Sequence, residues 1–275
     1  MAVKRNPSAQ LRHRGAGSAA TPAAAQVPRH GLARVLSKIG VCSRTQAQVL
    51  IRAGRVRIDG RIIIDPEAPT DAQTAHITLD GATLAAAQKR YLMLNKPRGY
   101  VTTARDEHGR DTVYTLLQGA GLPWLGPVGR LDKASEGLLL LSNDSAWAAR
   151  LTDPDSQLDK TYHVQIDTLP ESDLLVRLEQ GIDDAGALLA AKSVRELRRG
   201  AKNAWLEIVL DEGRNRQIRR LLAAFGINVL RLVRVAIGAL ALGDLAQGKW
   251  RALTVAEVEA LTTGTSLPSP RQRPT

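Results

Sequence analysis

Cysteine and aromatic residues are scarce in this sequence of 275 residues, and each scarcity argues against a class of site. The single cysteine, Cys42, excludes an intramolecular disulfide framework and is typical of a protein of the reducing cytoplasm. One thiol and five scattered histidines supply too few soft ligands for zinc, so no metal site is expected. Aromatic residues make up 3% of the chain, which argues against an aromatic platform that stacks single-stranded RNA.

Acidic residues are also outnumbered, since 38 Lys and Arg face 27 Asp and Glu and leave a formal net charge of +11. Such a surplus favours a polyanionic partner, and nucleic acid is the first candidate. An anionic membrane surface would attract the same charge, but the sequence has no long apolar span and no signal-peptide core. We therefore expect a cytoplasmic protein with nucleic acid as its partner and without membrane attachment. We also expect it to be a monomer.

Composition divides the chain into four parts. Residues 1–28 hold eight alanines and no acidic residue, which predicts a disordered basic arm, although a mitochondrial transit peptide has a similar composition. Residues 264–275 are rich in Pro, Ser and Thr and predict a disordered tail. An alanine-rich linker at 82–88 separates the two ordered parts that we expect, 29–88 and 89–263.

The first ordered part predicts a small basic module. Apolar residues at helical spacing predict one helix that Gly40 closes, and Ser43 is a plausible N-cap of a second helix that ends at Gly54. Asp59-Gly60 is a hairpin signal between two short apolar stretches. A solvated basic face would carry the same charges, but six basic side chains are candidates for RNA contacts. They are Arg34, Lys38, Arg44, Arg52, Arg55 and Arg57.

The stretch GRLDKASEGLLLLSND, residues 129–144, organises the second part. Its four leucines at 138–141 predict a strand buried on both faces, or else a segment of buried helix. Asp132 precedes them on a loop that enters the core, where desolvation is costly unless a cation faces the carboxylate. An isolated aspartate of this kind could equally cap a turn.

Two later stretches add candidate site residues. DKTYHVQI predicts a half-buried strand in which Tyr162 alternates with polar neighbours. DEGRNRQIRRLLAAFG predicts a helix with Ile218 on its apolar stripe and with arginines in its first turns. Four arginines within seven residues would repel one another unless they face phosphate or a buried carboxylate. They are Arg214, Arg216, Arg219 and Arg220. Upstream, Lys96 and Arg98 either contact phosphate or flank a turn.

Taken together, these stretches resemble the RsuA-type ribosomal RNA pseudouridine synthases, the branch of RsuA, RluB, RluE and RluF. GRLD followed by GLLLL, NKPxGxVTT, KTYxV and GRxxQIR occur here in the order of that family. Residues 29–81 resemble the alpha-L RNA-binding domain that precedes the catalytic domain in many members. The closing segment GDLAQGKWRALT is similar to that of members that act on the large subunit.

The resemblance implies an α+β fold: a small helix-hairpin domain, then a catalytic domain with a mixed, mainly antiparallel sheet and flanking helices. It implies isomerisation of uridine to pseudouridine in ribosomal RNA, large-subunit RNA being favoured, without metal or organic cofactor. Asp132 would attack C1′ or remove the C2′ proton, and either route needs an ionised carboxylate.

The resemblance also assigns the supporting residues. Arg219 would pair with the catalytic aspartate, and Tyr162 would stack on the target uracil and could accept a proton. Ile218 would pack beneath the base. Arg130 would fill the place that the flipped uridine leaves, or contact a phosphate. Lys96, Arg214 and Arg216 are candidate RNA contacts.

Two other classes of protein remain open. A non-catalytic RNA-binding or ribosome-assembly protein would need the basic module alone, but would leave Asp132, Tyr162 and Arg219 without a role. A hydrolytic RNA N-glycosylase also acts at C1′, but normally needs a second carboxylate to activate water. The products separate the three classes: unchanged RNA, free uracil with an abasic site, or pseudouridine.

Overall fold

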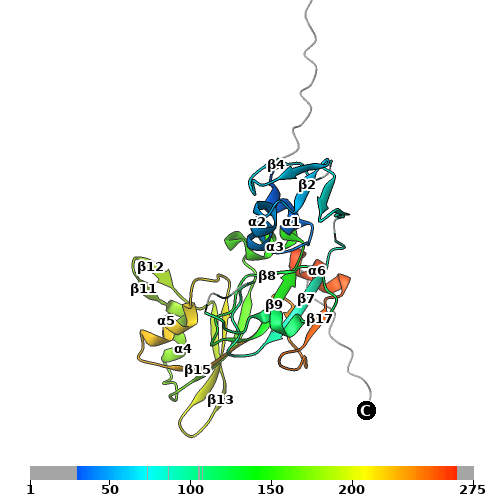
Figure 1. The fold of residues 1–275 in the computed structure, drawn as a ribbon. Helices are drawn as coiled ribbons and strands as arrows, with labels where there is room; N and C mark the ends of the chain where they lie inside the picture. Colours follow the sequence, from blue (N-terminus) through cyan, green and yellow to red (C-terminus); the bar gives the residue numbers. More distant parts are fainter. Residues whose placement is uncertain (1–29, 73, 86, 105, 107, 265–275) are drawn as a thin grey trace, which may run out of the picture.

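The computed structural model describes residues 30–264 except 73, 86, 105 and 107. The basic arm predicted for 1–28 lies outside the described residues, and so does the predicted tail apart from Gly264. Figure 1 shows a small N-terminal module above a larger part built on one long sheet. The fold is therefore α+β, as predicted.

Two helices and short strands form the N-terminal module around a core of its own (Figure 1). Ser43 caps the second helix as predicted, and it forms a reciprocal capping box with Gln46. Asp59 and Gly60 both have positive φ, 50° and 81°, as the tight turn of the predicted hairpin requires. The elements are β1 (His30–Gly31), α1 (Leu32–Lys38), α2 (Arg44–Arg52), β2 (Val56–Ile58), β3 (Arg61–Ile63), β4 (Pro69–Thr70), β5 (Ile77–Leu79) and β6 (Ala82–Thr83).

The larger part is built on a nine-stranded sheet with the path β13-β14-β10-β15-β9-β7-β17. Every strand pair is antiparallel except β15 with β9, so the sheet is mixed and mainly antiparallel. Its strands are β7 (Tyr91–Lys96), β8 (Gly126–Val128), β9 (Glu136–Ser142), β10 (Lys160–Ile166), β13 (Ser193–Arg199), β14 (Ala204–Leu210), β15 (Val229–Ile237), β16 (Leu240–Ala241) and β17 (Trp250–Ala252). Helices and a short hairpin flank it: η1 (Val113–Leu117), α3 (Ser145–Thr152), η2 (Pro154–Ser156), α4 (Leu174–Gln180), β11 (Ile182–Asp184), β12 (Ala187–Leu189), α5 (Gln217–Ala223) and α6 (Val255–Thr263).

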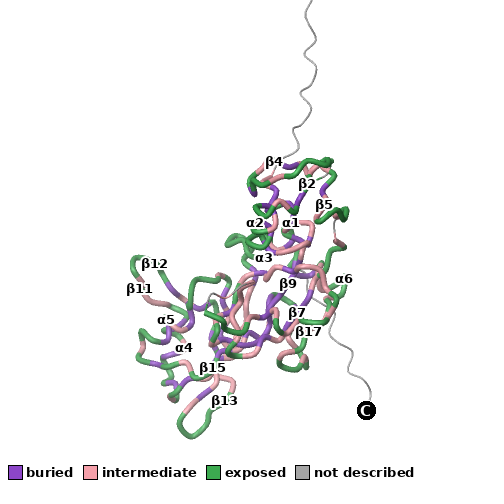
Figure 2. The backbone as a smooth tube through the Cα atoms, viewed as in Figure 1, coloured by how far each residue is buried: buried purple, intermediate pink, exposed green. Residues whose placement is uncertain are grey.

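Strand β9 carries the leucine run and is buried along its whole length (Figure 2). Leu138 and Leu140 belong to one core, with Trp147 of α3, whereas Leu139 and Leu141 belong to another, which also holds Val113 of η1. The alternation decides between the two predictions for this run, because successive residues of a strand point to opposite faces. The run is a strand that is buried on both sides.

Glycine at position 137 allows β9 and β15 to meet. Gly137 has φ of +99°, and a Cβ there would lie 2.2 Å from the backbone oxygen of Arg234. The parallel pairing of the two strands covers only two residue pairs, Val233 with Glu136 and Arg234 with Gly137. Beyond Gly137, β9 pairs with β7 and β8 while β15 pairs with β10 and β16, so the two strands diverge.

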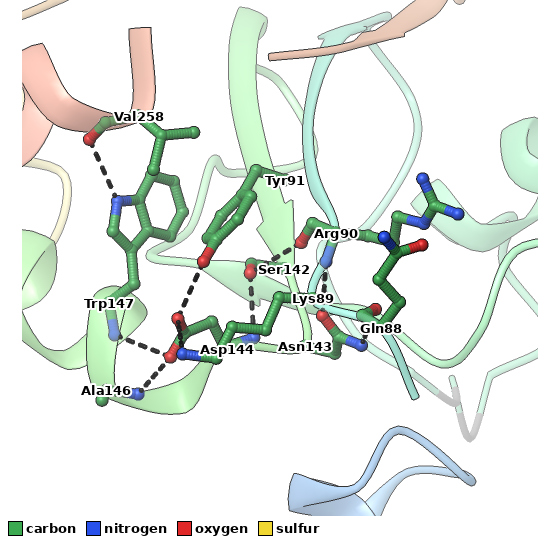
Figure 3. A network of polar contacts seen from close by, with 10 residues as sticks. All are labelled: Gln88, Lys89, Arg90, Tyr91, Ser142, Asn143, Asp144, Ala146, Trp147 and Val258. Carbon is green, nitrogen blue, oxygen red and sulfur yellow. Dashed lines mark hydrogen bonds and ion pairs between the residues drawn. The ribbon is translucent and has the colours of Figure 1, made fainter. Parts of the chain in front are cut away.

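A polar network fastens the linker to the end of β9 (Figure 3). The Asn143 side chain donates to the Gln88 carbonyl at 3.0 Å and accepts from the Arg90 amide at 2.8 Å. The Asp144 carboxylate accepts from the Tyr91 hydroxyl at 2.9 Å and also caps α3. The turn after α1 adds a contact, since the Gly40 carbonyl accepts from the Trp124 amide at 3.1 Å.

Candidate active site

A cavity of about 700 Å³ opens between the Asp132 loop, strand β10 and the N-terminal end of α5. The stretches that contain Asp132, Tyr162 and Ile218 are far apart in the sequence, and all three contribute side chains to the wall of this cavity. The lining includes seven of the predicted site residues: Arg130, Asp132, Tyr162, Arg214, Arg216, Ile218 and Arg219. The chemistry-bearing residues of the second part therefore meet at one site.

The Asp132 loop is fixed by its own backbone carbonyls. Thr102 donates its hydroxyl to the Leu131 carbonyl at 2.7 Å, and the Gly99 amide donates to the Lys133 carbonyl at 2.8 Å. The Ser135 amide closes a turn onto the Asp132 carbonyl at 3.0 Å. These bonds leave the Asp132 side chain free to face the cavity, where 31% of it is exposed.

Lys96 lies beneath this loop and does not contact solvent. It is 0% exposed, and its Nζ donates to the carbonyls of Pro97, Asp132 and Ser135 at 3.1, 3.0 and 2.8 Å. Burial lowers the pKa of Lys96 from 10.5 to about 8, although Asp132 and Glu136 oppose that shift. The prediction that Lys96 contacts phosphate is therefore wrong, because all of its donors are used inside the protein.

The ion pair of Asp132 also differs from the prediction. Its Oδ2 lies 3.6 Å from Nη1 of Arg216, and no ion pair with Arg219 forms in the described part of the chain. The sequence predicted Arg216 in the first turn of the helix. In the structure Arg216 precedes α5 and has the left-handed conformation, with φ of 50°. That conformation accounts for the difference, because the side chain of a residue outside the helix does not follow the helical face.

Arg219 donates to two backbone carbonyls and does not pair with Asp132. Its Nη2 donates to the Ala134 carbonyl at 3.2 Å and its Nη1 to the Val229 carbonyl at 3.3 Å. Burial and the neighbouring Arg216 lower the pKa of Arg219, while Asp132 raises it. Arg219 therefore ties the Asp132 loop to β15 and adds positive charge near the carboxylate.

A buried glutamine shapes the loop before α5. Gln217 donates to the Ala190 carbonyl at 3.1 Å and to the Glu212 carboxylate at 2.6 Å. Arg214 pairs with the same carboxylate at 2.8 Å and donates to the Leu188 carbonyl. Glu212 also lines the cavity, and its carboxylate is held by these two donors.

Tyr162 and Ile218 belong to the apolar part of the wall. Ile218 is buried in the core beneath β10 and β14, and Tyr162 packs against both this core and the one that holds Leu139. Arg130 is exposed at the edge.

The six basic residues of the N-terminal module lie apart from this cavity. Arg44 pairs with Glu67 and Arg55 with Asp80, so these two charges are partly neutralised. Arg34 and Arg52 are exposed, and the structure gives neither an acidic partner in the described residues.

Two further cations, which were not among the predicted site residues, line the cavity. Arg234 is buried in β15, and Lys160 at the start of β10 donates to the Asp211 carbonyl at 3.0 Å. Arg234 lies in a strand to which the sequence assigned no site residue, and the pairing of β10 with β15 reveals it. Lys160 opens the KTYxV stretch, in which the resemblance assigned a role to Tyr162 alone. No group of three or more His, Cys, Asp or Glu residues suited to a metal occurs within the described ranges. No described helix is long and apolar enough to cross a membrane.

Fold and cavity together define an α+β protein in which one carboxylate faces the arginine-rich N-terminus of a helix. Residues 90–224 match the RNA pseudouridylate synthase family, and residues 31–69 match the S4 domain. The chain is 37% identical over 230 residues to an uncharacterised RNA pseudouridine synthase of Aquifex aeolicus, covering 83% of this chain and 92% of that one.

A second relative is the ribosomal large subunit pseudouridine synthase B of Bacillus subtilis, which is 34% identical over 84% of this chain and 94% of its own. A solved pseudouridylate synthase superposes with a TM-score of 0.58 at 31% identity, covering 84% of this chain and 99% of that one. The chain belongs to the RNA pseudouridine synthase family. It is an RNA-modifying isomerase that carries an N-terminal S4 domain.

Proposed function

We propose that this enzyme isomerises a uridine of ribosomal RNA, in the large subunit, with Asp132 as the residue that acts on the ribose. The observation that carries the proposal is the single cavity into which Asp132, Tyr162 and Ile218 project from three separate stretches. Large-subunit RNA is favoured by the closing segment of the sequence and by the similarity to the Bacillus subtilis enzyme.

The chemistry accounts for these residue types. The bond between C1′ and N1 breaks and a bond between C1′ and C5 forms, with no net oxidation or reduction. An ionised carboxylate either attacks C1′ or removes the C2′ proton. The uridine must first leave its stack, at a cost of roughly a few kcal/mol. Arg130, exposed at the edge of the cavity, would take the vacated place or contact a phosphate.

The supporting roles follow from the contacts. Tyr162 would stack on the flipped uracil above Ile218. Arg219, which holds the Ala134 carbonyl, would act on Asp132 through its loop, and Arg216 would supply the nearby positive charge. Arg214 would contact RNA at the edge.

The chain would use residues 29–88 for affinity and 89–263 for chemistry. The separate core of the N-terminal module supports this division. The exposed Arg34 and Arg52 would contribute most to the affinity, with Lys38, Arg44, Arg55 and Arg57 around them. We place the protein in the cytoplasm as a monomer.

The test is Asp132→Asn, which keeps the shape and removes the basic oxygen. Either route needs that oxygen, so turnover should fall by more than the roughly 100- to 10,000-fold that an auxiliary acid or base contributes. Tritium release from RNA labelled at uracil C5 measures turnover, and filter binding on the same protein should show retained affinity. Mapping pseudouridines in ribosomal RNA of a deletion strain identifies the target. Appreciable single-turnover release by the Asn variant would remove Asp132 from this role.

A further inference from the structure

Arg234 occupies the inner end of the cavity, at the point where β9 and β15 diverge. The residue is 6% exposed and lines the cavity. It is the cross-strand partner of Tyr162, so the two side chains leave the sheet on the same face as neighbours. A base stacked on Tyr162 would present its edge to Arg234.

The Arg234 guanidinium is only partly satisfied. Its Nε donates to the Leu138 carbonyl at 2.7 Å, while its Nη2 is buried and has no hydrogen-bond partner. Buried donors are nearly always paired, because an unpaired N–H loses its water and gains nothing in return. An orphaned donor on a residue that lines a cavity therefore indicates an acceptor on a ligand.

The surroundings of Arg234 select an anionic acceptor. Its charge helps to lower the pKa of both Lys96 and Lys160, although burial is the larger cause for each. No described carboxylate lies within ion-pair distance of Arg234, so its charge is not neutralised by the protein. Leu140 and Ile237 line the same cavity, and their apolar surfaces suit a base better than a hydrated phosphate.

We infer that Arg234 binds a carbonyl oxygen of the uracil anion that forms when the glycosidic bond breaks. The inference rests on the function proposed above. The C1′–N1 bond breaks with its electron pair on the ring, where the charge spreads over N1, O2 and O4. The ring turns, that pair forms the C5–C1′ bond, and C5 then loses its proton while N1 gains one. Arg234 donates a hydrogen bond throughout and transfers no proton.

A preorganised donor of this kind stabilises the charge that develops in the transition state. Arg234→Gln should therefore slow single turnover by about 100-fold, with RNA affinity little changed. The decisive measurement repeats the assay on the same RNA with 5-fluorouridine at the target. Fluorine stabilises the anion without help from the protein, so the defect of the variant should become roughly tenfold smaller. C5 carries fluorine and no hydrogen in that substrate, so the ring cannot lose a proton after the C5–C1′ bond forms, and water adds across N1=C6 instead. The fluorinated, hydrated C5-glycoside is followed by nuclease digestion and mass-resolved chromatography.

Arg195→Gln on β13 is the matched control, because this exposed arginine pairs with Glu207 and does not line the cavity. It should match the wild type on both RNAs.

If Arg234→Gln does not fold, Arg234→Lys keeps a cation and is measured on the same two substrates. A defect of equal size on both RNAs would overturn the inference and mark Arg234 as a support for β9. A loss confined to RNA affinity would overturn it in favour of a phosphate contact. Failure of the proposed function is distinct, because the wild type would then make no pseudouridine.

Discussion

Lys96 offers a test of the site that is independent of RNA, since its burial makes stability depend on pH. Its ammonium is enclosed and bonded to three carbonyls, one of which belongs to Asp132. Burial nevertheless lowers the pKa of Lys96 to about 8, against 10.5 for an exposed lysine. The replacement Lys96→Met removes the titrating group and keeps an apolar chain of similar length.

The free energy of unfolding rises with pH wherever the unfolded chain holds more protons than the native protein. Between pH 8 and pH 10.5 the unfolded chain keeps the Lys96 proton while the native protein loses it. The free energy of unfolding therefore rises with pH across this window, and the burial penalty is fully present below pH 8. Because each pKa unit corresponds to about 1.4 kcal/mol, the interval amounts to about 3 kcal/mol.

Urea unfolding followed by circular dichroism, at pH values from about 7 to 11, measures this contribution. Subtracting the curve of Lys96→Met from that of the wild type isolates Lys96 from all other titrating groups. The difference should increase by about 3 kcal/mol towards high pH. Lys202→Met, at the exposed β13–β14 turn, controls for alkaline effects unrelated to burial. A difference that stays flat between pH 8 and 10.5 would show that Lys96 is not held as a desolvated ammonium.

Two further predictions concern the arginines. Arg216→Gln should reduce turnover by less than about tenfold, because its ion pair with Asp132 is half-exposed and worth roughly 1 kcal/mol or less. Arg219→Lys should cost more in single-turnover assays, about 100-fold, because lysine loses the planar fork that spans two carbonyls. The opposite order would give the larger role to Arg216 and would contradict the role of Arg219 in holding the Asp132 loop. In the N-terminal module, replacing Arg34 and Arg52 with Gln should lower the slope of log affinity against log salt by roughly 0.7 to 0.9 per contact, without changing turnover at saturating RNA. An unchanged slope would remove both residues from the RNA interface.

The sequence predicts burial best where a stretch has no polar residue that could face water. Four consecutive leucines at 138–141 have no polar member that could face water, so a buried element was unavoidable. By contrast, β13 carries only Val194 as a buried residue and exposes most of its charged side chains. Such an edge strand has little hydrophobic pattern, and its pairing with β14 is a long-range property. The hairpin β11–β12 also has little hydrophobic pattern, with Leu189 as its one buried residue, and Ala185 and Gly186 form its turn.

The site, too, has residues that the sequence could predict and contacts that it could not. Asp132, Tyr162 and Ile218 could be placed in one cavity because the resemblance links their three stretches. The contacts of Lys96 and Arg216 could not be predicted, since a one-residue change in where α5 begins redirects an arginine. Arg234 carried no signal, because a basic residue in a strand is usually exposed.

Three cations in the cavity wall or beneath the Asp132 loop share one arrangement, which explains why their charge remains available. Lys96, Arg219 and Arg234 each donate to backbone carbonyls, and none of the three has a carboxylate within ion-pair distance in the described ranges. Arginines elsewhere on the same sheet pair with acids, as Arg231 does with Glu136. A carbonyl dipole fixes a cation in position without cancelling its charge, whereas a carboxylate does both. The fold therefore holds three positive charges in fixed geometry, two of them in the cavity wall and one beneath the Asp132 loop. Those charges can then act on an anion that exists only during the reaction, and they need not reorganise when it forms.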